Sequence, residues 1–142
     1  MWEKMTKIAA ALAGAAAGLL GEWNVLLTVL AWMMGIDYLT GLICAWRGRS
    51  PKTEGGGVSS KAGFDGLARK SLIIMIVLMA TLLDRAIGSG QALFQTAAAG
   101  YYIANEGISI LENSALMGVP YPKAIVEALE GLRDGGDAGG GE

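Results

Sequence analysis

A long apolar stretch, from Val25 to Trp46, limits more than any other feature how this chain can fold. About 20 consecutive apolar residues, rising roughly 1.5 Å each in a helix, are enough to cross the hydrocarbon core of a bilayer. The only acidic or basic side chain in the stretch is Asp37. A carboxylate at membrane depth is costly unless it faces a partner, the interior of a helix bundle, or water. The stretch therefore predicts a membrane span, and Asp37 predicts a function within it.

The composition agrees with a membrane protein and excludes several other classes. Hydrophobic residues make up 53% of the chain and charged residues only 17%. The net charge of −2 and the lack of a basic, aromatic-rich patch argue against a nucleic-acid partner. The chain has no histidine and a single cysteine, Cys44, so we expect no disulfide, zinc site or histidine-based catalysis within one chain. We therefore expect an integral membrane protein without metal or cofactor.

The first apolar segment, from about Ile8 to Leu20, is short, rich in alanine and glycine, and follows Lys4 and Lys7. A basic start before a short apolar run is also the pattern of a signal peptide. Only a brief polar turn separates this segment from Val25, which favours a hairpin of two helices. Small residues let helices approach closely in lipid, and we expect helix packing through such positions. These positions are Ala10, Gly14, Gly18 and Gly41.

A polar stretch after Trp46 is expected to form the main loop. Its basic residues are Arg47, Arg49, Lys52, Lys61, Arg69 and Lys70. Only Glu54 and Asp65 oppose them, and short loops with such an excess of basic residues stay in the cytoplasm. The N-terminus is basic as well, so it belongs on the same side. An even number of crossings must then precede the loop, as a helical hairpin provides.

Two further spans and a short final helix complete the predicted fold. The third span is centred on 71–83 and reaches spanning length over 68–87, with Arg69 and Lys70 snorkelling toward the surface. The fourth runs from about Gln91 to Leu111. After Gly118 we expect a short amphipathic helix at the cytoplasmic membrane surface or against a neighbouring subunit, followed by a disordered tail, GGDAGGGE. The predicted class is an all-α membrane protein with about four transmembrane helices in 1–118, a cytoplasmic segment in 119–142, and both termini in the cytoplasm.

Polar side chains in the second and fourth spans are the candidate functional residues. In the fourth span they recur at helical spacing and form one stripe. The stripe consists of Gln95, Tyr102, Glu106, Ser109 and Asn113, with Gln91 at its start. It either forms hydrogen bonds between helices or lines a water-filled lesion. Asp37, with Thr40 on the same face, either forms an ion pair with Lys61, Arg69 or Lys70, or acts in gating or conduction.

Several short motifs, in this order and spacing, resemble the phage holin family that includes the clostridial toxin-secretion holins. They are Asp37-Tyr38-x-Thr40-Gly41, Ser59-Ser60-Lys61 with Gly63 and Gly66, Arg69-Lys70, Asn105-Glu106-x-x-Ser109-Ile110-x-Glu112-Asn113, and Gly118-Val119-Pro120. The resemblance covers about 25–132. It implies a non-enzymatic, multi-pass protein of the bacterial cytoplasmic membrane that forms homo-oligomers among membrane lipids. Such proteins open lesions through which a phage endolysin reaches the cell wall, without any necessary contact between the two proteins.

Two other classes are compatible with a small helical membrane protein. A small multidrug transporter exchanges protons for a cationic drug at a membrane carboxylate, but such transporters carry an essential glutamate in the first helix. Here the only acidic residue before Gly21 is Glu3, which lies outside the apolar segment. An antiholin or scaffold that regulates a partner without forming a pore is the other alternative.

Overall fold

The computed structural model describes residues 1–20 and 23–137. Within this part the chain folds into five α-helices and one short 3-10 helix. The elements are α1 (Trp2–Leu20), α2 (Val25–Trp46), η1 (Glu54–Gly56), α3 (Ser60–Ile87), α4 (Leu93–Leu116) and α5 (Lys123–Asp137). The predicted all-α class is confirmed.

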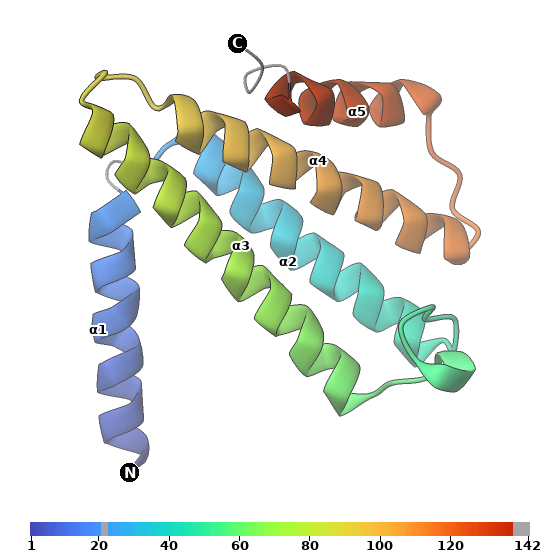
Figure 1. Cartoon of the computed structure of the whole chain (residues 1–142). Coiled ribbons are helices and arrows are strands. Elements are labelled where there is room, and N and C mark those ends of the chain that lie inside the picture. The colour runs from blue at the N-terminus through green and yellow to red at the C-terminus, as the bar shows by residue number, and fades with distance from the viewer. Residues whose placement is uncertain (21–22, 138–142) are drawn as a thin grey trace.

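Helices α2, α3 and α4 form the body of the molecule, as Figure 1 shows. Helix α4 packs against both α2 and α3, whereas α2 and α3 make little direct contact with each other. Helix α5 returns along α4, and α1 stands apart and contacts mainly α3 (Figure 1). The apolar core lies where α2, α3 and α4 meet. It consists of Leu27, Leu30, Met34, Ile73, Val77, Ala99 and Ile103.

Two helices, α2 and α3, are long and apolar enough to cross a membrane. Only 22% of the apolar window in α2 and 28% of that in α3 is buried inside the molecule. The core helix of a soluble protein would be mostly buried, so the exposed apolar surface of these two helices favours contact with lipid or with other helices. Helices α1 and α4 do not meet the same test among the described residues. The arrangement with four spans stays a prediction.

Helix α3 begins earlier than expected, and the predicted loop over 47–70 is correspondingly too long. The side chain of Ser59 accepts a hydrogen bond from the backbone N–H of Ala62 and caps the helix. Gly63 and Gly66, expected in the loop, lie in the helix beneath the ring of Tyr38. A Cβ atom at Gly63 would lie 3.6 Å from the Tyr38 hydroxyl, an ordinary van der Waals contact, so α2 and α3 meet here at Tyr38. The irregular connection is reduced to 47–59.

Helix α4 begins under a cap that comes from the preceding helix. The Asp84 carboxylate accepts hydrogen bonds from the backbone N–H groups of Phe94 (2.9 Å) and Gln95 (2.8 Å). These N–H groups have no partner within their own helix, and a carboxylate is a favourable acceptor at this end of the helix dipole. The helix ends at Leu116, five residues beyond the predicted Leu111.

Helix α5 packs on α4 of its own chain, and its expected place at the membrane surface or against a neighbouring subunit stays a prediction. The contact depends on Gly107 in α4. A Cβ atom there would lie 2.8 and 2.9 Å from the methyl carbons of Leu129 and 3.0 Å from the Met33 Cε atom. A Cβ atom at Gly107 would require the ends of these two side chains to shift, although Leu129 is buried. The helix continues to Asp137, so the predicted disordered tail begins too early, and 138–142 lie outside the described residues.

The small-residue stripe of α1 does not pack within this chain. Ala10, Gly14 and Gly18 are exposed, and nothing lies within 4 Å of a Cβ atom built at either glycine. The expected packing role of this stripe is a prediction that concerns another molecule. Gly41 lies instead in the bundle, where a Cβ atom would be 3.7 Å from the Asn113 Nδ2 atom.

Candidate functional site: a buried lysine between two carboxylates

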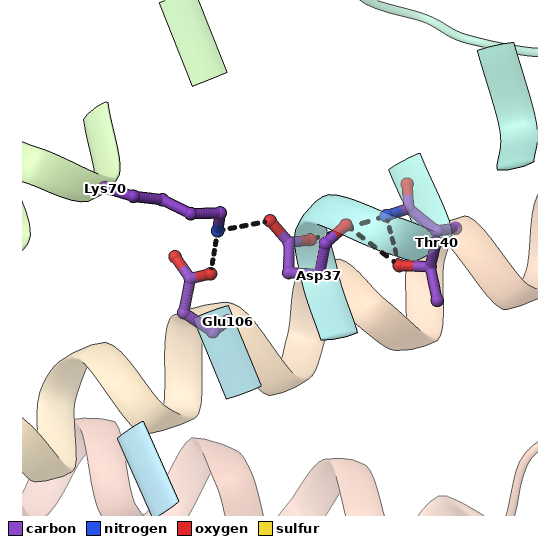
Figure 2. Close-up of polar contacts among 5 residues, drawn as sticks. Asp37, Thr40, Lys70 and Glu106 are labelled. Carbon is purple, nitrogen blue, oxygen red and sulfur yellow. Dashed lines mark hydrogen bonds and ion pairs between the residues drawn. The ribbon is translucent and has the colours of Figure 1, made fainter. Parts of the chain in front are cut away.

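A buried lysine joins the three helices of the bundle. The Lys70 ammonium of α3 forms ion pairs with Asp37 of α2, at 2.9 Å, and with Glu106 of α4. Figure 2 shows the lysine side chain reaching between the two carboxylates. The three side chains are only 8–11% exposed. We call Asp37, Lys70 and Glu106 the Lys70 cluster.

Uncharged groups extend the Lys70 cluster along α2 and α4. The Asn113 amide donates hydrogen bonds to the hydroxyl of Thr40 (3.0 Å) and to Asp37 Oδ1 (3.4 Å). The Thr40 hydroxyl donates to the backbone carbonyl of Asp37 (Figure 2), and the Cys44 thiol donates to the carbonyl of Asn113 at 3.2 Å. Within residues 1–20 and 23–137, every fully buried side-chain nitrogen or oxygen has a hydrogen-bond partner. The network is therefore satisfied as it stands.

The Lys70 cluster carries two carboxylates and one ammonium, a formal charge of −1 in a buried place. Removing one partner of a buried ion pair costs about 3–5 kcal/mol, whereas the complete pair contributes little net stability because each charge has lost its hydration. The charges of the Lys70 cluster are therefore compensated only while α2, α3 and α4 keep their relative positions. Separation of the helices would return the three charges to water.

A second polar contact links the bundle near the start of α4. The Gln95 amide donates to the Thr81 hydroxyl of α3 at 2.8 Å, and the Asn24 amide at the start of α2 donates to Gln95 Oε1 at 2.9 Å. Gln95 is buried, like Glu106 and Asn113 further along the same stripe. The buried part of the stripe therefore faces α2 and α3 in this structure.

A groove of about 600 Å³ leads to the Lys70 cluster. It lies between α2, α3 and the 47–59 connection, with α4 contributing to its inner end. Tyr102 and Ser109, the less buried members of the stripe, line it. Besides Lys70, two of the predicted loop cations, Lys52 and Arg69, also line it.

Three basic residues of the predicted loop, Arg47, Arg49 and Lys61, do not line the groove. Arg47 and Lys61 are exposed, and Arg49 donates a hydrogen bond to the carbonyl of Leu116 at 3.0 Å. Lys70 is buried, so the expectation that it snorkels to the membrane surface is wrong. It turns inward because Asp37 and Glu106 are within reach and compensate its charge.

The spacing of residues along α3 indicates that Lys70 lies on its buried face. Lys70, Ile73, Val77 and Thr81 recur at helical spacing, and all four are buried on one face of α3. The predicted helix starts only near Lys70, so the prediction does not place the lysine on this buried face. Of the three cations considered as partners for Asp37, the structure selects Lys70.

Comparison with known proteins gives consistent matches. A model of the bacteriophage holin family matches residues 14–134. An uncharacterized 14.9 kDa protein of Clostridium perfringens is 39% identical over 114 residues, which cover 80% of this chain and 81% of the relative. An uncharacterized protein of Halalkalibacterium halodurans is 38% identical over 129 residues, covering 88% and 90%. A protein of Bacillus phage phi105 described as a probable holin is 34% identical over 103 residues, covering 72% and 70%. No solved structure matches.

Proposed function

The chain belongs to the bacteriophage holin family, and we propose that it is a holin that assembles with copies of itself in the bacterial cytoplasmic membrane and opens lesions there. Through such lesions an endolysin held in the cytoplasm would reach the cell wall. The observation that carries the mechanism is the Lys70 cluster, which joins α2, α3 and α4 through buried charges.

Two packings of the same helices would account for a delayed, sudden opening. In the sealed packing, the charges of the Lys70 cluster compensate one another in a dry interior. In the open packing, α2 and α4 turn the same polar side chains toward water, where each charge is hydrated separately. Because both states satisfy the charges, the difference in free energy between them can be small, and packed interfaces of this kind switch rather than deform gradually.

The outer surface of the bundle supports assembly within a membrane. Large apolar side chains are exposed along α2 and α3, among them Trp32, Leu39, Met75 and Met79. Continuous apolar surface of this kind favours lipid or a second subunit as its neighbour. The exposed small-residue stripe of α1 offers a further surface for close helix packing between subunits.

Depolarisation of the membrane is the proposed trigger. A charge that moves across the full membrane potential gains or loses about 2.3 kcal/mol per 100 mV. The formal charge of −1 in the Lys70 cluster makes the position of this group in the field energetically significant. The free energy that depolarisation by 100 mV changes, about 2.3 kcal/mol per charge, is comparable to a small difference in free energy between the two packings.

The test is expression of the full chain from an inducible promoter in a bacterial host, with and without an endolysin that lacks a secretion signal. We expect membrane potential to collapse abruptly after a delay in both strains, and culture density to fall sharply only when the endolysin is present. Drug resistance without collapse would indicate a transporter. Unchanged potential and density, or delayed lysis by a second holin, would indicate a scaffold or antiholin and would overturn the proposal.

A further inference from the structure

Two cations besides Lys70 line the groove. Among the described residues, neither Lys52 nor Arg69 has an acidic partner within the 4.0 Å ion-pair distance. Asp65, one helical turn before Arg69, is the single acidic residue of the lining outside the Lys70 cluster. The described lining as a whole balances, with three acidic and three basic side chains, and the part outside the Lys70 cluster has one more positive than negative side chain.

The walls of the same groove are apolar where α2 and α3 face outward. Leu42 of α2 and Leu72 and Ile76 of α3 line the groove and remain exposed. These two helices are the ones long and apolar enough to cross a membrane, and they make little direct contact with each other. An opening between two such helices, with cations near one end and apolar walls along it, matches a molecule that joins an anion to hydrocarbon chains.

We propose that the groove binds one anionic glycerophospholipid, with its phosphate near Lys52 and Arg69 and an acyl chain along Leu42, Leu72 and Ile76. The proposal rests on the proposed membrane insertion. Basic pockets between membrane helices favour anionic lipid headgroups, and each basic residue contributes roughly a fivefold preference. A bound lipid would fill the space between α2 and α3 and thereby support the sealed packing of the Lys70 cluster.

A free phosphate ester would satisfy the cations alone. The apolar walls distinguish the two ligands, because a water-soluble anion would leave Leu42, Leu72 and Ile76 without a partner. If the free phosphate ester were the ligand, its affinity for the groove would equal that of a phospholipid with the same phosphate.

The test measures lipid retention by the full-length protein in detergent, by native mass spectrometry with equal amounts of phosphatidylglycerol and phosphatidylcholine. We expect one phosphatidylglycerol per chain in preference to phosphatidylcholine. The double variant Lys52→Gln/Arg69→Gln should lower this preference roughly 25-fold, about fivefold for each cation. Asp65→Asn should raise it, a gain that misfolding would not produce.

The matched control is Arg47→Gln/Lys61→Gln, which removes the same two side-chain types from the same region but outside the groove. It should keep the preference of the original chain. Equal loss in both double variants, or no loss in either, would overturn the proposal, as would complete displacement of the lipid by glycerol phosphate at equal concentration. Failure of the protein to insert into phosphatidylcholine vesicles would instead count against the proposed function itself.

Discussion

A single side chain, Lys70, compensates carboxylates from two other helices, and this makes the bundle sensitive to changes at one residue. The neighbouring Arg69 is exposed and carries the same charge. The two residues differ because consecutive positions on a helix point about 100° apart, so only one of them can share the buried face with Ile73 and Val77.

Lys70→Met should destabilise the sealed bundle, because it leaves Asp37 and Glu106 as two buried carboxylates without a cation. The loss of one partner of a buried ion pair costs about 3–5 kcal/mol. We expect lower thermal stability in detergent and lysis that begins earlier at matched protein levels. The control is Lys61→Met, which removes an exposed lysine of the same helix and should leave both unchanged.

Glu106→Gln should have the opposite effect on timing. The variant removes the excess negative charge of the Lys70 cluster while keeping the shape of the side chain and a hydrogen-bond acceptor for Lys70. The sealed state becomes more stable because it no longer buries an uncompensated charge, and the open state no longer gains the hydration of that charge. We expect delayed lysis with unchanged accumulation in the membrane; lysis at the normal time would remove Glu106 from the mechanism.

The sequence alone predicted that Asp37 and the stripe of α4 would matter, since polar groups in apolar helices need partners. It did not predict which of three cations would pair with Asp37, nor that Glu106 would share that cation. Those facts depend on the relative rotation of α2, α3 and α4, which residue spacing within one helix does not determine. Gln95 illustrates the same limit, because its partners Asn24 and Thr81 come from two other helices.

At the scale of whole elements, α2 was predicted to its end residues, because a polar turn with Asn24 as cap begins it and an arginine-rich turn follows it. The predicted start of α3 lies too far along the chain, because the polar stretch after Trp46, interrupted by Pro51 and the glycines at 55–57, predicts a loop as far as Lys70. That predicted loop includes Gly63 and Gly66. In the folded chain they are contact points for Tyr38. A glycine in a helix costs about 1 kcal/mol in isolation, and close packing offsets this cost.

Gly107→Val should release α5 from α4. The added side chain would occupy the space of the Leu129 methyl groups, and overpacking of this kind costs about 1–3 kcal/mol. Hydrogen exchange of the backbone amides over 123–137 should accelerate, while exchange in α2 and α3 should stay slow. Leu129→Ala in the same chain should partly restore protection by making room, and no restoration would show that the contact does not hold α5.

At the scale of the whole molecule, the docked position of α5 bears on membrane insertion. Its outer face carries exposed charges, including Glu127, Glu130 and Asp134. If α4 crosses the membrane as predicted, these charges must avoid lipid, so α5 has to leave α4 or be covered by a neighbouring subunit. The Gly107→Val variant, which frees α5, should therefore insert at least as well as the original chain.

The predicted orientation places both termini and the predicted loop over 47–70 in the cytoplasm, on the basis of the excess of basic residues there. Reporter domains fused after Trp46 and after Arg133 should both report a cytoplasmic location. Opposite locations would mean that an odd number of crossings separates the two positions, and the four-span arrangement would be wrong.

Cys44 permits the most direct test of the central claim, that the polar network around Lys70 is dry in the sealed state and wet in the open one. It is the only cysteine of the chain, is 1% exposed, and donates to the carbonyl of Asn113 within that network. A small charged thiol reagent, which needs water at the sulfur, should be added to membranes before and after triggering. A Cys44→Ser chain with Lys61→Cys serves as an exposed control.

We predict that Cys44 stays unlabelled until triggering and is labelled within the interval in which the membrane potential collapses, while the control is labelled throughout. Labelling of Cys44 before triggering would contradict a sealed network. Lysis at the normal time with Cys44 still unlabelled would contradict the opening of that network to water.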